Sequence, residues 1–136
     1  MSSPVFIAGA GVISAIGNNI AENLSALEDE VPGMKEMQYL HSVHRHKLPV
    51  AEVKMSNEEL AAIAGMPAHI SRTALLSAIA AKEALHNAAI ENFNELRTGF
   101  ISANTVGGMD KTEDFFPEFL SDPNKGRLRS IVHHEC

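Results

Sequence analysis

Histidine and cysteine have the widest chemical range in this sequence, and they fall into two groups. The first group is spaced His-x2-His-x-His and the second His-His-x-Cys. Imidazole nitrogens and thiolates bind metals, and a cysteine beside an oriented base is a nucleophile. Neither spacing matches a structural zinc site, so we interpret the histidines as solvated loop residues. No metal site and no catalytic residue is predicted from His41, His44, His46, His133, His134 and Cys136.

A glycine-rich stretch, the first glycine segment (residues 9–17), follows the apolar run 5–8. Its Gly-x-Gly start half-matches a dinucleotide-binding fingerprint, in which glycines let the backbone approach a pyrophosphate. The third position of that fingerprint is Ser14 rather than Gly or Ala, and no acidic residue stands at the expected distance. We favour close backbone packing at Gly9 and Gly11, and a dinucleotide-binding domain stays open as an alternative.

A second glycine segment (residues 104–109) reads Asn-Thr-Val-Gly-Gly-Met and follows another apolar run. Ligands in open α/β sheets collect at the carboxyl ends of strands. Two adjacent glycines there let the backbone pass close to a ligand. The second glycine segment is therefore the best candidate for a pocket, and a tight turn without a ligand is the alternative.

The elements that would position these segments alternate between strands and helices. Short apolar runs predict buried strands at 5–8 and 99–104, and Pro49 confines a strand at 48–53 to a sheet edge or a strand start. Residues 71–89 include seven alanines and no Gly or Pro, which predicts a long internal helix capped by Ser71. That helix could cross over between the two buried strands if they pair in parallel.

Three shorter helices are also predicted. Their signals are a capping side chain at the start, an apolar period of three to four residues and a glycine or proline near the end. The resulting order of strands and helices indicates an α/β layered architecture. The first spans 20–29 after Asn18 or Asn19, and the second runs from Ser56 to about Gly65. The third begins near Asp110, and Pro117 interrupts its apolar pattern or lies in its first turns.

Composition sets further limits on the class of protein. The 136 residues carry 11 Lys and Arg against 17 Asp and Glu, for a net charge of −6. We interpret the basic residues as unclustered, which argues against a nucleic-acid-binding surface. The uncharged stretch near the start is too short to span a membrane. One cysteine excludes an internal disulfide and is typical of a cytoplasmic protein.

Several of these stretches, in order, resemble one family. Residues 5–14 with Ile16-Gly17-Asn18 resemble the opening of β-ketoacyl-acyl-carrier-protein synthases, which starts with a strand and a Gly-x-Gly-hydrophobic-hydrophobic-Ser segment. The Ala-rich helix from Arg72 to Ala88 resembles their internal helix. Arg97-x-Gly99 followed by Val106-Gly107-Gly108 is similar to their next strand and its glycine turn.

The resemblance implies a thiolase-like fold that is incomplete in this chain, with a parallel-sheet core and the Ala-rich helix inside. Residues 1–136 would form the N-terminal part of a single ketosynthase domain. Members are acyltransferases that condense an acyl group with malonyl-acyl carrier protein in fatty acid or polyketide-like biosynthesis. They are usually homodimers and need no cofactor or metal. The implied partners are acyl carrier protein and acyl thioesters, with no nucleic acid or membrane.

The resemblance also limits which residues carry over. The family's nucleophile lies in a Thr-Ala-Cys segment, which this sequence does not contain, and its two catalytic histidines come later in the chain. No catalytic residue is therefore assigned, and this chain alone is expected to be inactive. The substrate-binding residues implied are Val106, Gly107 and Gly108, beside the acyl pocket. A non-catalytic subunit that pairs with another chain is a further alternative.

Overall fold

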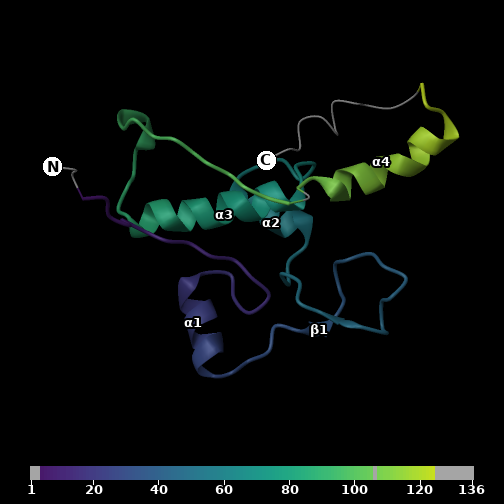
Figure 1. The fold of residues 1–136 in the computed structure, drawn as a ribbon, viewed down its shortest axis with the longest axis horizontal. Helices are drawn as coiled ribbons and strands as arrows, with labels where there is room; N and C mark the ends of the chain where they lie inside the picture. Colours follow the sequence, from purple (N-terminus) through teal and green to yellow (C-terminus); the bar gives the residue numbers. More distant parts are fainter. Residues whose placement is uncertain (1–3, 106, 125–136) are drawn as a thin grey trace. The chain divides into compact units, whose positions relative to one another are not determined.

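The protein is a small mixed α/β chain. The computed structural model describes residues 4–105 and 107–124, in which four α-helices accompany one two-stranded sheet (Figure 1). The chain divides into two compact units: Met1–Ser56 with Ile79–Arg97, and Asn57–Ala78 with Thr98–Cys136. The elements are α1 (Ile20–Glu28), β1 (Lys35–Glu36), β2 (Pro49–Val50), α2 (Asn57–Ala64), α3 (Arg72–Asn87), a 3-10 helix η1 (Phe93–Glu95) and α4 (Met109–Ser121).

The start of α1 confirms the sequence prediction, whereas its buried face does not. Asn19 is the N-cap, and its side chain accepts a hydrogen bond from the Glu22 N–H. The predicted apolar face is largely exposed, with Leu24 and Leu27 at 54% and 64%. The buried residues are Asn23 and Ala26 instead, because the first glycine segment contacts this side of the helix through a hydrogen bond from Ser14 to Asn23.

The sheet is antiparallel and short. Lys35 pairs with Val50, and Glu36 pairs with Pro49. The predicted edge strand at 48–53 is thus confirmed only at its start, where Pro49 begins β2. The strands enclose residues 37–48, which include the three histidines that we interpreted as solvated loop residues.

Helix α3 is the longest helix described and confirms the Ala-rich prediction. Ser71 is fully buried, and its Oγ accepts a hydrogen bond from the Ala74 N–H at 3.3 Å, which caps the helix. The buried positions of this stretch, Ser71, Leu75 and Ile79, are four residues apart and form one narrow stripe. The remaining positions are half-buried or exposed, so the helix is not enclosed on two sides as expected.

Helices α2 and α4 also lie close to the predicted positions. Helix α2 ends before Gly65, which has a φ of 64°. Helix α4 continues through Pro117, which the sequence predicted to interrupt the helix or to lie in its first turns. None of the α4 side chains is fully buried, although Phe115 and Phe119 contact each other with ring centroids 6.5 Å apart.

The two predicted buried strands are wrong. Residues 5–8 and 99–104 form no strand, and their apolar side chains are exposed: Val5 97%, Ile7 92%, Phe100 71% and Ile101 96%. An extended segment becomes a strand only when a neighbouring strand accepts its backbone hydrogen bonds, and the described residues supply none. The predicted parallel core is therefore absent from the part of the chain that the structure describes.

The buried apolar residues form a small core in each unit. Ala26, Met37, Val53 and Ile79 are buried in the first unit, and Leu60, Ala61, Ala64 and Leu75 in the second. Across the described ranges, no helix combines the length and the apolar composition needed to cross a bilayer.

Candidate functional site

The first glycine segment lies against the C-terminal half of α3 (Figure 1). A Cβ atom at Gly9 would lie 2.2 Å from the Ala84 carbonyl oxygen, and one at Gly11 would lie 2.0 Å from the Ala80 carbonyl oxygen. Both distances are far below van der Waals contact, so only glycine allows this approach. The Asn87 side chain fixes the register by donating a hydrogen bond to the Ala10 carbonyl at 2.9 Å.

Glu83 of α3 contacts both the first glycine segment and the start of α1. One carboxylate oxygen accepts a hydrogen bond from the Val12 N–H at 2.8 Å. The other accepts from the Ile20 N–H, also at 2.8 Å, at the first residue of α1. Because a charged acceptor strengthens each bond, one side chain fixes the segment between α3 and the start of α1.

These contacts explain the Gly-x-Gly pattern without a nucleotide. A dinucleotide-binding fingerprint needs its glycines to present backbone to a pyrophosphate. Here the sides of Gly9 and Gly11 that lack a Cβ face backbone atoms of α3. The structure therefore favours the packing interpretation of the first glycine segment.

The second glycine segment forms a turn that starts α4. Gly108 is buried, is the N-cap of α4 and has a φ of 79°, which non-glycine residues rarely adopt. Its carbonyl oxygen accepts hydrogen bonds from the Lys111 N–H at 3.0 Å and the Thr112 N–H at 3.3 Å. The Gly107 N–H donates to the Asn104 side chain, so the turn is closed by its own residues.

A side chain of α4 links the second glycine segment to the start of α3. The Asp110 carboxylate accepts a hydrogen bond from the Arg72 N–H at 3.1 Å. This places a negative charge at the positive end of α3, where it is favourable. The Arg72 guanidinium in turn donates to the Asn57 side chain at 2.8 Å, at the first residue of α2.

The predicted site residues are accounted for as follows. Gly107 is half-buried and Gly108 is buried at the start of α4, whereas Val106 lies outside the described residues. His41, His44 and His46 are all exposed on the loop between β1 and β2. His133, His134 and Cys136 lie outside the described residues. Within the described ranges, no three His, Cys, Asp or Glu side chains come together as a metal site.

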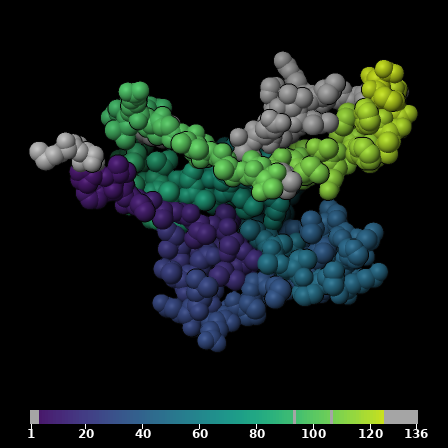
Figure 2. All heavy atoms as spheres, viewed as in Figure 1, coloured from purple at the N-terminus to yellow at the C-terminus, as the bar shows by residue number. Residues whose placement is uncertain are grey.

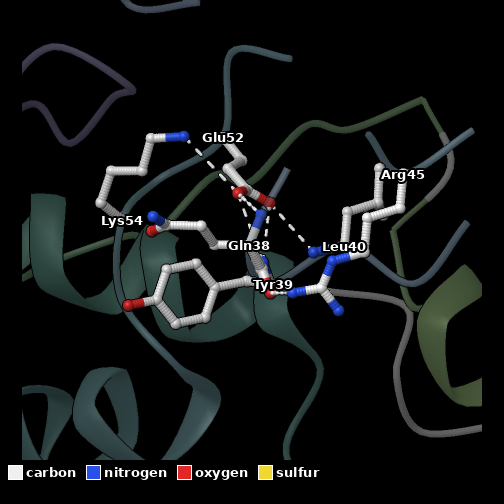
Figure 3. A network of polar contacts seen from close by, with 6 residues as sticks. All are labelled: Gln38, Tyr39, Leu40, Arg45, Glu52 and Lys54. Carbon is white, nitrogen blue, oxygen red and sulfur yellow. Dashed lines mark hydrogen bonds and ion pairs between the residues drawn. The ribbon is translucent and has the colours of Figure 1, made fainter. Parts of the chain in front are cut away.

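The loop that carries those histidines, the histidine loop (residues 38–48), is organised in a way that the sequence did not predict. The Glu52 carboxylate accepts hydrogen bonds from three successive backbone N–H groups (Figure 3). The donors are Gln38 at 2.5 Å, Tyr39 at 3.2 Å and Leu40 at 2.9 Å.

Two cations complete this network (Figure 3). Lys54 forms an ion pair with Glu52 at 3.5 Å, and Arg45 donates to the Gln38 carbonyl at 3.3 Å. Burial of the Glu52 carboxyl raises its pKa, but the three backbone hydrogen bonds and the charge of Lys54 outweigh burial. The pKa of Glu52 therefore lies below its ordinary value.

The local charge balance was the signal that could have drawn attention to this loop. Residues 35–54 contain four of the 11 Lys and Arg and only two of the 17 Asp and Glu, together with three histidines. The region is therefore basic within an acidic chain, and the basic residues are more clustered than the sequence analysis assumed.

Comparisons with known proteins identify no relative of this chain. No family model matches it, and neither the curated proteins nor the solved structures contain a significant match.

Proposed function

We propose that this chain is the N-terminal part of a β-ketoacyl-acyl-carrier-protein synthase, which condenses an acyl group with malonyl-acyl carrier protein. The observation that carries the proposal is the fit of the first glycine segment against α3. The resemblance rests on a Gly-x-Gly segment and an Ala-rich helix. The two motifs are matched in the structure: Gly9 and Gly11 lie so close to backbone atoms of Ala84 and Ala80 that a side chain at either glycine would clash with the helix.

A second observation supports the incomplete fold. The two segments that the resemblance assigns to strands of the core sheet form no helix or strand and expose nearly all of their apolar side chains, as Val5, Ile7 and Ile101 illustrate. Large apolar side chains this exposed are typical of surfaces that another protein segment covers. In a ketosynthase domain, further strands of the sheet would cover them.

In this proposal Val106, Gly107 and Gly108 line the acyl pocket, and acyl thioesters bind beside them. The left-handed conformation of Gly108 directs the chain from residues 99–104 into α4. The proposed parent enzyme acts as a homodimer on acyl carrier protein substrates in the cytoplasm. This chain alone contains no Thr-Ala-Cys segment, so it has no nucleophile for the condensation.

Photolabelling with an acyl pantetheine thioester that carries a diazirine on its acyl chain tests the proposed pocket. Trypsin cleaves after Arg97 and Lys111, so the second glycine segment is recovered in one peptide, 98–111. We expect the label to concentrate in this peptide and to be displaced by unlabelled acyl thioester. Val106→Trp should fill the pocket and abolish that labelling.

A matched variant controls for non-specific apolar binding. Ile101 is 96% exposed in the same tryptic peptide but outside the proposed pocket, so Ile101→Trp should leave the labelling unchanged. Labelling that follows exposed apolar side chains throughout the chain, or that Val106→Trp does not affect, would contradict the proposed pocket. An assay with acyl and malonyl carrier protein should give no condensation product with this chain alone.

A further inference from the structure

We propose that the backbone N–H groups of residues 38–40 form a binding site for a phosphate group, and that the Glu52 carboxylate occupies this site as an internal ligand. The site belongs to the histidine loop, is separate from both glycine segments and does not require the proposed function. Three features support it: converging donors, an excess of cations around them, and an internal anion that a ligand from solution can replace.

The donors converge on both oxygens of one carboxylate (Figure 3). The Gln38 N–H donates to one oxygen at 2.5 Å and the Leu40 N–H to the other at 2.9 Å. The Tyr39 N–H lies between them, 3.3 and 3.2 Å from the two oxygens. Successive backbone N–H groups that point to one position form an anion-binding nest, as in many phosphate sites. The spacing of these donors therefore suits the oxygens of a small oxyanion.

The site also favours negative charge. Burial of the Glu52 carboxyl raises its pKa, yet the three backbone hydrogen bonds and the charge of Lys54 together lower it. The energy that keeps this carboxylate ionised comes from groups that a different anion would meet in the same place. Glu52 thus reports what the site binds.

The cations around the donors outnumber the anions, which points to phosphate rather than to a second carboxylate. Lys54 lies 3.5 Å from Glu52, and Arg45 donates to the Gln38 carbonyl at 3.3 Å. Residues 35–54 contain four Lys and Arg against two Asp and Glu, so positive charge remains after Glu52 is counted. A phosphate group carries about −1.5 to −2 charges at pH 7, whereas a carboxylate carries about −1. Phosphate would therefore neutralise more of this excess.

A ligand can reach the donors from solvent. Leu40, which supplies one of the three N–H groups, is 53% exposed, and Arg45 is exposed as well. Residues 35–54 are the blue and teal atoms in Figure 2. Glu52 can leave the donors and keep its ion pair with Lys54, because that ammonium group is itself only partly covered. Exchange of the internal carboxylate for a phosphate group therefore leaves neither charge buried and unpaired.

The test removes the internal ligand and titrates the full chain with inorganic phosphate at neutral pH and constant ionic strength, followed by heteronuclear NMR of the backbone amides. Glu52→Ala should bind phosphate at least about tenfold more tightly than the wild-type chain, because no carboxylate competes for the donors. The amide signals of residues 38–40 should shift on binding. In the wild-type chain the same signals should shift only at higher phosphate concentrations.

Glu36→Ala is the matched control for charge. It removes one negative charge from the same stretch, but the Glu36 carboxylate contacts His46 rather than the backbone donors. It should change the affinity for phosphate less than about twofold, because an exposed charge is screened at this ionic strength. An equal gain of affinity in Glu36→Ala and Glu52→Ala would show non-specific attraction and would overturn the site.

A second variant covers the case in which Glu52→Ala disrupts the loop. Glu52→Gln keeps the size of the side chain but removes its charge, so phosphate should displace the amide more readily than the native carboxylate. In the Glu52→Gln background, Lys54→Gln should weaken phosphate binding about fivefold, because it removes a cation beside the ligand. Arg97→Gln makes the same charge change at an exposed position of the same unit and should not weaken it.

Two further probes define the ligand. Acetate should bind the Glu52→Ala chain more weakly than phosphate does, and equal affinity would overturn the choice of phosphate. Phenyl phosphate that binds as tightly as inorganic phosphate would support a phosphate group carried by a larger molecule, whereas its exclusion would support the free ion. If phosphate shifts residues 38–40 in neither Glu52 variant, the site is wrong. The labelling of peptide 98–111 still decides the acyl pocket in every case.

Discussion

The two glycine segments both follow runs that the sequence predicts as buried strands, yet the structure uses them differently. Gly9 and Gly11 face the backbone of α3, where added Cβ atoms would lie 2.2 and 2.0 Å from carbonyl oxygens. Gly107 and Gly108 form a turn closed by Asn104 and by the first residues of α4. The same residue type therefore serves helix packing in one segment and a change of chain direction in the other.

This difference decides which segment is the better candidate for ligand binding. The glycines of the first segment are already covered by atoms of the chain, so a ligand would have to displace α3. At Gly107 of the second segment the nearest atoms belong to the movable Asn104 side chain, 2.5 Å from an added Cβ, so a ligand there would not have to displace a helix. We therefore place the proposed acyl pocket at the second segment and assign a packing role to the first.

The largest expected effect comes from adding one methyl group at the helix contact. Gly11→Ala should destabilise the protein by about 3 kcal/mol or more, because the clash is with backbone rather than with a movable side chain. Gly99→Ala is the matched control, since a Cβ there meets no atom within 4 Å. Urea unfolding followed by circular dichroism measures both. A Gly11→Ala protein as stable as the Gly99→Ala protein would contradict the packing role.

An intermediate effect is expected from Glu83→Gln. The amide retains one acceptor oxygen and places an NH2 group against the second backbone N–H, so one of the two charge-assisted hydrogen bonds is lost. We expect a loss of about 2 kcal/mol in the free energy of unfolding. Glu91→Gln, at an exposed position in the same unit, is the control and should change little. Faster amide exchange at Val12 and Ile20 would locate the effect, and unchanged exchange there would count against it.

The smallest expected effect is at the second segment. Gly108→Ala forces a side chain into a left-handed backbone conformation, which costs about 1 kcal/mol. Because the cost is local, the start of α4 should fray while α3 keeps its protection from amide exchange. Destabilisation as large as that of Gly11→Ala would show that the second segment is also a packing contact, and would weaken the distinction between the two.

The helices could be predicted from the sequence because their signals are local. Asn19, Ser71 and Gly65 mark helix ends through their own side chains or backbone conformation, and all three stand where expected. The buried strands could not be predicted reliably. An apolar run such as residues 5–8 indicates only that burial would stabilise its side chains. Whether it forms a strand depends on a second strand that accepts its backbone hydrogen bonds, and the run itself does not specify that strand.

The candidate site was predictable only in part. Two adjacent glycines indicated a turn, and Gly107 and Gly108 do form one at the start of α4. The choice between packing and ligand binding at Gly9 and Gly11 required the position of α3, which the sequence does not determine. The hydrogen bonds from residues 38–40 to Glu52 were not predicted. Their donors are backbone N–H groups twelve to fourteen residues away from the carboxylate, so no pattern of side chains in the sequence indicates them.

The coding sequence downstream of Cys136 tests the proposed membership of the ketosynthase family most directly. The account predicts an open reading frame that soon encodes a cysteine in a Thr-Ala-Cys segment at the start of a helix, followed later by two histidines that could serve the condensation. A continued reading frame without such a cysteine, or with a different catalytic segment in its place, would contradict the proposed function.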